Sequence, residues 1–189
     1  MKIVSISKTV AAVLALTILF LTSCERDDII RPKDVTAVGG QYSGELNVTG
    51  TATKKYSTKF AIGGVGIELG QMPLDEIIPL VIKDSQQAQT ALAKTPFGLL
   101  KMDYSAVSTE SGIINVFATP EQMKFDVLED GKTKNVNVSF NVTSQPVYSI
   151  SKKTINFEVQ ATQISVDGKV VASSPIHFKF VQCKNLSAK

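Results

Sequence analysis

The chain has 189 residues, of which 43% are hydrophobic and 20% charged, so it is long enough for one domain with a sizeable core. Its 20 Lys and Arg residues stand against 17 Asp and Glu, a formal net charge of +3. This near-neutral balance, without a strong basic cluster, excludes the usual electrostatics of nucleic-acid binding, and we expect no nucleic-acid partner.

Residues 1–23 have the composition of a signal peptide. Two lysines give a positive start, and the apolar run over residues 10–21 is too short to span a membrane. Small residues then lead to Cys24. This order resembles a bacterial lipoprotein signal with its lipobox, which implies cleavage before Cys24 and attachment of diacylglycerol to its sulfur. The alternatives are an ordinary signal peptide with an incidental cysteine, or a buried helix.

Residues 24–40 form the predicted lipidated tether, and residues 41–189 a single β-rich domain. A flexible chain of this length spans about 20–25 Å, which would hold the domain close to the membrane. The acidic residues 25–28 resemble the surface-export signal of lipoproteins from Bacteroidetes. That resemblance implies a place on the outer membrane, facing the cell exterior. The alternative is a merely solvated, charged tether on a periplasmic protein.

The domain shows the alternation of apolar and polar residues that is typical of β-strands. The dipeptides Asp130-Gly131 and Asp167-Gly168 lie between such runs and predict tight hairpins. Strands are expected over residues 42–48, 55–62, 65–69, 99–107, 113–118, 123–128, 136–142, 147–150, 154–166, 169–172 and 176–180.

The strongest predicted strand, residues 154–166, changes the parity of its apolar positions near its end. One extra residue near Thr162 and Gln163 would keep the apolar side chains on one face, which predicts a β-bulge there. Pro175 interrupts the pattern before the last strand, because proline cannot donate to a ladder.

Two segments depart from the β pattern. Residues 73–78 read as a short helix that Pro79 limits to about a turn and a half. Asp84 can cap a second helix over residues 85–94, with Gln87 as a weak capping-box partner. The sequence therefore predicts a mainly β protein, an antiparallel β-sandwich or barrel-like sheet with one or two short helices. The sandwich is favoured, with the Asp84 helix over an edge or end.

His177 is the only histidine, and its parity on the last strand places it on the outer face. A Ser-His-Asp triad through His177 lacks the Gly-x-Ser-x-Gly elbow that would present a nucleophile. Cys183 stays alone once Cys24 carries lipid, and we expect a buried thiol without a base beside it. One histidine and one free cysteine are too few for a zinc site, so no metal and no cofactor is predicted.

Adjacent carboxylates could serve a glycosidase. Each pair has a simpler local role, so no catalytic residue is predicted and we expect a protein that is not an enzyme. The pairs are Asp75-Glu76 at a helix start, Glu129-Asp130 at a turn and Asp27-Asp28 in the tether.

A carbohydrate-binding surface commonly exposes Trp or Tyr rings. The chain has no Trp and four Tyr. Tyr42 and Tyr104 follow strand patterns and are expected in the core. Tyr56 and Tyr148 are the candidates for an exposed ring.

The opening of the domain, residues 38–46, and the later Met72-Pro73-Leu74 resemble, together with the lipobox, a family of small Bacteroidetes lipoproteins without an assigned activity. The resemblance covers about residues 35–185 and carries over Cys24 alone as a site residue. The Gly-x-Tyr-x-Gly pattern around Tyr42 is also similar to lipocalin-like barrels, which implies an apolar pocket inside a barrel.

The function that these features predict is that of a lipid-anchored, non-catalytic envelope protein that binds another envelope protein or an extracellular polymer such as a glycan. A lipocalin-like carrier of a small apolar ligand is the second candidate, and a hydrolase the third. A carrier predicts one deep apolar cavity, whereas an interaction protein predicts a filled interior and an exposed apolar patch.

Overall fold

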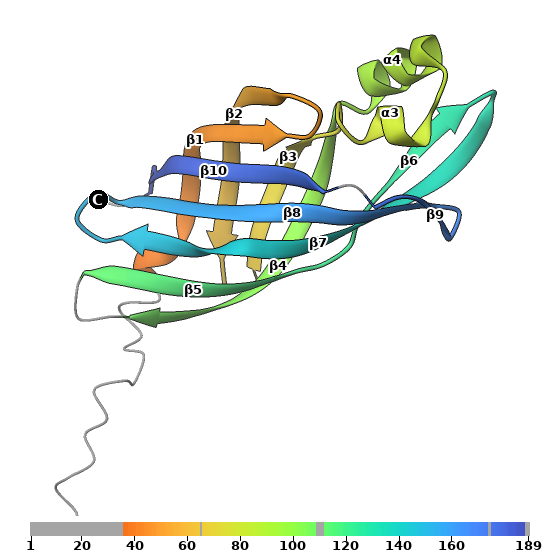
Figure 1. The fold of residues 1–189 in the computed structure, drawn as a ribbon. Coiled ribbons are helices and arrows are strands. Elements are labelled where there is room, and N and C mark those ends of the chain that lie inside the picture. Colours follow the sequence, from red (N-terminus) through yellow and green to blue (C-terminus); the bar gives the residue numbers. More distant parts are fainter. Residues whose placement is uncertain (1–35, 65, 109–111, 174, 188–189) are drawn as a thin grey trace, which may run out of the picture.

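The structure is a computed structural model that describes residues 36–64, 66–108, 112–173 and 175–187. As predicted, the protein is mainly β, and its strands pair antiparallel throughout (Figure 1). The strands are β1 (Gly40–Thr49), β2 (Thr53–Gly63), β3 (Gly66–Pro73), β4 (Phe97–Ser108), β5 (Ile113–Pro120), β6 (Met123–Glu129), β7 (Lys132–Ser149), β8 (Thr154–Val166), β9 (Lys169–Ala172) and β10 (Ile176–Asn185).

Eight of these strands close into a barrel, so the predicted preference for a sandwich is wrong. The order around the ring is β7-β5-β4-β3-β2-β1-β10-β8, and pairing between β7 and β8 closes it. β6 and β9 extend the sheet beyond the ring, each paired with one barrel strand. Closure removes the two free edges that a sandwich would leave on these eight strands.

The long strand β7 makes closure possible, because it exchanges one neighbour for another along its length. Its first part pairs with β6, from Lys132 to Val138, and its last part pairs with β5, from Val147 to Ser149. Register shifts against β8 bend it between these parts. The separate strand predicted over residues 147–150 is therefore the end of β7, and Pro146 lies at one of its register shifts.

The predicted turns and bulge are confirmed. Asp130 and Gly131 have φ of 52° and 74°, and the second Asp-Gly pair has the same left-handed geometry, which is typical of two-residue hairpins. Ser139 pairs with Gln163 while Phe140 pairs with Ala161, so one extra residue lies between them on β8.

The helices differ in part from the prediction. Residues 73–78 do not form a helix: β3 ends at Pro73, and α3 (Ile78–Val81) follows with Pro79 in its first turn. A proline suits that position, because the first N–H groups of a helix have no partner within it. The capped helix is confirmed as α4 (Ser85–Lys94), where the Gln87 N–H donates to Asp84 Oδ1 at 2.8 Å.

Aromatic rings from different walls meet inside the barrel. Tyr42 on β1 stacks on Phe60 on β2, with ring centroids 5.0 Å apart. Phe157 on β8 stacks on Phe180 on β10 at 4.2 Å and meets the edge of Phe60 at 5.6 Å. All of these side chains are buried, so the middle of the barrel holds packed rings.

The tyrosine predictions hold in part. Tyr42 is buried as expected and Tyr104 is half-buried against the core. Tyr148 is buried, so its predicted exposure is wrong, because the register shifts in β7 turn its side chain toward Tyr42. Tyr56 is half-buried.

In the described part of the chain, no helix is both long and apolar enough to cross a bilayer.

Candidate functional site: a groove between a helix and a hairpin

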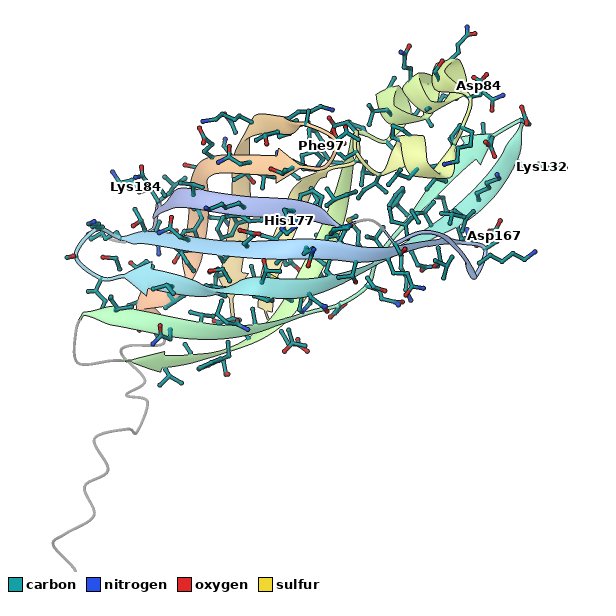
Figure 2. All side chains as sticks on the ribbon, in the orientation of Figure 1. Asp84, Phe97, Lys132, Asp167, His177 and Lys184 are labelled. Atoms are coloured by element: carbon teal, nitrogen blue, oxygen red, sulfur yellow. The ribbon has the colours of Figure 1, made fainter. Side chains whose placement is uncertain are left out.

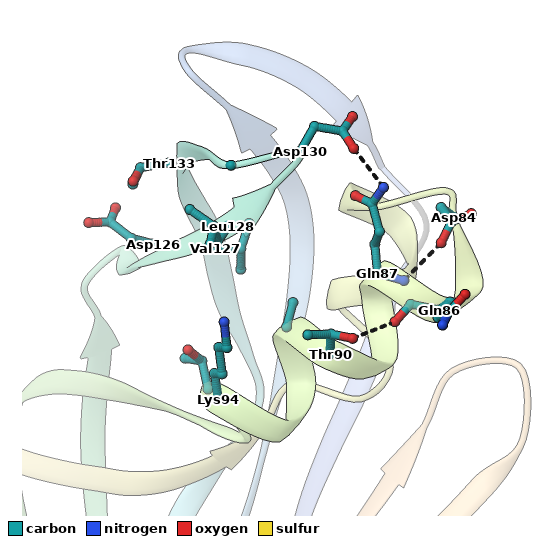
Figure 3. A pocket seen from close by; sticks show the side chains of 13 residues that line it. Asp84, Gln86, Gln87, Thr90, Lys94, Asp126, Val127, Leu128, Asp130 and Thr133 are labelled. Carbon is teal, nitrogen blue, oxygen red and sulfur yellow. Dashed lines mark hydrogen bonds between the residues drawn. The ribbon is translucent and has the colours of Figure 1, made fainter.

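A groove of about 590 Å³ lies outside the barrel, between α4 and the hairpin of β6 and β7 (Figure 3). Amide, hydroxyl and carboxylate groups line it, together with one lysine and three small or branched apolar side chains. The lining residues are Asp84, Gln86, Gln87, Thr90, Ala91, Lys94, Thr95, Asp126, Val127, Leu128, Asp130, Gly131 and Thr133.

Local sequence signals position the helical wall of the groove. Asp84 fixes the start of α4 through its cap, and Thr90 Oγ1 donates to the Gln86 carbonyl at 2.8 Å. The side chain of Gln87 does not complete a capping box. Its Nε2 donates instead to Asp130 Oδ1 in the hairpin turn at 2.7 Å, which ties the two walls together (Figure 3).

The opposite wall is the edge of β6. Among the described residues, β6 pairs with β7 alone. The two-residue turn makes Glu129 and Lys132 the hydrogen-bonded closing pair, so the main-chain groups of Leu128 and Asp126 point away from β7. Both residues line the groove, and the Leu128 side chain is 47% exposed.

A second cluster of polar side chains lies where the β1–β2 turn meets the segment before α3. Lys54 Nζ lies 2.6 Å from Asp75 Oδ2 and 2.8 Å from Glu76 Oε1. The Tyr56 hydroxyl also donates to Asp75 Oδ2, at 2.5 Å. Thr51 donates from its backbone and hydroxyl to Glu76 Oε2. These contacts hold the turn against the segment before α3.

The ionisation of this cluster follows from its contacts. Burial alone would raise the pKa of Asp75, but hydrogen bonds from Lys54 and Tyr56 hold the pKa below its ordinary value of 3.8. Hydrogen bonds to Asp75 and Glu76 raise the pKa of Lys54. Burial, and then the hydrogen bond to Asp75, raise the pKa of Tyr56 to about 12.

Replacing Lys54 with methionine is expected to lower the free energy of unfolding by about 1 kcal/mol at neutral pH. The substitution leaves Glu76 without its cation, and the Glu76 side chain is 8% exposed. The loss stays modest because solvent screens Lys54, which is 44% exposed. Urea denaturation measures it. Lys55→Met is the matched control, because the Lys55–Glu45 pair is exposed on both sides, and no measurable change is expected.

The pKa shifts of Asp75 and Tyr56 predict how the stability of this cluster changes with pH. Because the pKa of Asp75 is depressed in the folded state, its contribution is present above 3.8 and is lost as the pH falls through the folded value. The raised pKa of Tyr56 gives a contribution present below 10.0 and lost as the pH rises to about 12. The difference between wild type and Lys54→Met should therefore shrink below pH 3.8. A difference that stays constant into acid would contradict the assignment.

The structure places the candidate catalytic residues apart. His177 lies on the outer face as predicted, half-buried, with Nδ1 at 2.8 Å from Glu158 Oε1 and Nε2 at 3.3 Å from Gln160 Nε2. Cys183 is buried as predicted, and burial raises the pKa of its thiol to about 12. In the described ranges, no three His, Cys, Asp or Glu side chains gather as metal ligands would.

The carboxylate pairs are engaged in the roles expected of them, with one difference. Glu129 pairs with Lys134 beside the hairpin turn, and Asp130 accepts from Gln87. Asp75 and Glu76 bind Lys54 before α3 and do not start a helix. Cys24 and Asp27-Asp28 lie outside the described residues.

The groove itself was not predicted from the sequence. The sequence predicted Asp84 as a helix cap and Asp130 as part of a hairpin turn, but neither prediction places the two residues beside a common groove. The contact between Gln87 and Asp130 joins positions 43 residues apart, and no periodic pattern encodes it.

Of the comparisons with known proteins, only the comparison with protein families finds a match. No curated protein and no solved structure matches the chain. Residues 37–166 match the family described as a domain of unknown function, DUF4840, which spans β1 to β8 and so includes α4 and both walls of the groove. This match covers more than half of the chain, and the protein therefore belongs to the DUF4840 family.

Proposed function

We propose that this chain is a lipid-anchored, non-catalytic protein of the outer membrane, facing the cell exterior, that binds a polypeptide partner in the groove between α4 and the β6–β7 hairpin. Lipidation at Cys24 rests on the signal-like residues 1–23, and outward export on the acidic residues after Cys24. The observation that carries the binding role is the open edge of β6 along the groove.

An open strand edge supports a polypeptide partner because its main-chain N–H and C=O groups can pair with an added strand. In β6 these groups belong to Asp126 and Leu128. α4 stands on the other side of the groove, where its hydroxyl and amide side chains can contact the side chains of that strand. Three carboxylates and one lysine line the groove, so a segment carrying Lys or Arg fits its charge.

The lipocalin-like carrier is the second candidate, and the closed barrel favours it. Eight strands can enclose one small ligand or be filled by side chains. Here the rings of Tyr42, Phe60, Phe157 and Phe180 pack against one another in the middle of the barrel. This packing favours binding on the outside of the barrel over carriage within it.

A hydrolase is less well supported than either binding role. The Glu158–His177 pair lies on the outer wall of the barrel, and the groove lining holds neither residue. The carboxylates Asp84, Asp126 and Asp130 in the groove accept hydrogen bonds from neighbouring groups, as structural residues do.

Site-specific photo-crosslinking in cells that carry the full chain tests the proposal. A photoreactive residue at Leu128 is expected to give one discrete protein adduct. Thr90→Trp should abolish that adduct, because Thr90 lines the groove and a bulky ring there would fill it.

Gln89→Trp is the matched control, because Gln89 is an exposed neighbour on α4 outside the groove lining. This variant should keep the adduct. An adduct that survives Thr90→Trp, or the absence of any adduct, would contradict binding in the groove. A saccharide adduct would identify an extracellular polymer and overturn the polypeptide partner.

A further inference from the structure

One end of the barrel gathers the first described residues, the end of β10 and the β7–β8 turn (Figure 1). The Leu186 N–H donates to the Gln41 carbonyl at 2.7 Å, and the Asn185 N–H to the Lys153 carbonyl at 2.8 Å. α3, α4, the β6–β7 hairpin and β9 lie at the opposite end, together with the groove.

The start of the domain is firmly held at this first end. The Tyr42 hydroxyl donates to the Val38 carbonyl at 2.5 Å, and Asn185 Nδ2 donates to the Gly39 carbonyl at 3.1 Å. Val38 is fully buried, so the part of the chain that packs into the barrel includes Val38. Any tether from Cys24 therefore joins the barrel at this end and not at the groove.

The two ends differ in charge. Lys152, Lys153 and Lys184 lie in or beside the β7–β8 turn, because Lys184 pairs with Thr154. No described residue of the strand ends and turns around them is acidic, over residues 36–44, 60–64, 66–67, 104–108, 112–114, 148–156 and 182–187. Glu68 follows these residues on β3, opposite Ala61, and forms an ion pair with Lys101 at 3.7 Å. The opposite end carries charges of both signs. Its acidic residues are Asp75, Glu76, Asp84, Asp126, Glu129, Asp130 and Asp167, and its lysines are Lys54, Lys83, Lys94, Lys132, Lys134 and Lys169. Figure 2 labels Lys184 at the first end, and Asp84, Lys132 and Asp167 at the opposite end.

Apolar side chains accompany these lysines. Ile150 is 40% exposed and Leu186 is 59% exposed. Single exposed apolar residues are ordinary on a protein surface. Apolar side chains that lie near lysines, however, suit the boundary of an anionic bilayer, where the apolar groups enter the interface and the lysines are attracted to the headgroups.

We infer that this lysine-bearing end of the barrel, with Ile150 and Leu186, rests on an anionic bilayer surface and holds the groove away from the membrane. The inference rests on the proposed lipid anchor and deepens it, because it gives the anchored domain one orientation. We infer that the membrane, and no protein, contacts this surface. The tether joins the domain at this end, and the positive charge of the lysines complements the anionic lipids.

Fluorescence of the full lipidated protein in vesicles tests the orientation. An environment-sensitive fluorophore is attached to the Ile150→Cys variant, which is placed in vesicles of phosphatidylcholine and phosphatidylglycerol. Its emission is expected to shift to shorter wavelength and to be quenched by nitroxide groups on the lipids. The same probe on Val170→Cys, on β9 at the opposite end, should show neither effect; Val170 is 57% exposed. Cys183 stays unlabelled because it is fully buried.

Charge reversal completes the test. Lys152→Glu with Lys184→Glu should reduce the quenching at position 150, whereas Lys132→Glu with Lys169→Glu, at the groove end, should leave it unchanged. Equal quenching at positions 150 and 170 in protein that floats with the vesicles would overturn the orientation alone. Protein that does not float would overturn the lipid anchor as well. Neither result affects the crosslinking test of the groove.

Discussion

Replacing Phe157 with alanine is expected to lower the free energy of unfolding by about 3–5 kcal/mol. The ring stacks on Phe180 at 4.2 Å and meets the edge of Phe60 at 5.6 Å, so truncation removes contacts with two walls of the barrel. The closed ring of strands cannot collapse to fill the space, which keeps the cost high. Urea denaturation followed by circular dichroism measures the change.

Phe117→Ala is the matched control for this experiment. Phe117 is a phenylalanine on the barrel strand β5, but it is 54% exposed, and its truncation should change stability by no more than about 0.5 kcal/mol. Similar losses for the two variants would contradict a filled interior. The cavity of Phe157→Ala should also bind benzene, whereas wild type should not. Equal binding by wild type would favour the carrier.

Replacing Gly44 with alanine is expected to lower the free energy of unfolding by about 3 kcal/mol, the upper end of the usual cost of overpacking. A Cβ at Gly44 would lie 2.7 Å from both Cα and Sγ of Cys183, which is closer than such atoms approach. The thiol could rotate, but the Cα is part of β10 and moves only with that strand. The register of β1 and β10 shifts at this point, so the close approach is part of the barrel's curvature.

Gly70→Ala is the control for Gly44→Ala. Gly70 also lies within a strand beside a register shift, but a Cβ there would meet nothing within 4 Å. Thermal unfolding should show a clear drop for Gly44→Ala and little change for Gly70→Ala. Adding Cys183→Ala to Gly44→Ala should restore part of the loss, because it removes the sulfur and keeps the Cα. A Gly44→Ala protein as stable as wild type would contradict the steric account.

Much of the local structure was predictable from the sequence because local chemistry determines it. The Asp-Gly turns need left-handed backbone, the cap at Asp84 satisfies a free N–H, and the parity change near Thr162 marks an inserted residue. Each signal lies within a few residues of the feature that it specifies. These features were correct whichever way the strands assembled.

Closure of the barrel was not predictable in this way. Alternation shows that a strand has an inner and an outer face, but not which strand is its neighbour. β7 exchanges β6 for β5 along its length, and this exchange decides between barrel and sandwich. The same register shifts explain the error at Tyr148, which lies in the segment that was predicted as a separate short strand and is in fact the end of β7.

The length of β7 connects two parts of the fold that are held differently, the closed ring of the barrel and the tip of the β6–β7 hairpin. Its final residues are held on both sides, by β5 and β8, whereas β6, which shares the tip of the hairpin, has a neighbour on one side alone among the described strands. Amides at that tip can open to solvent while the ring beneath stays intact, since local unfolding begins where contacts are fewest. If a polypeptide binds as proposed, the strand that it adds would pair with this mobile edge of β6 and order the tip, while the closed barrel stays unchanged.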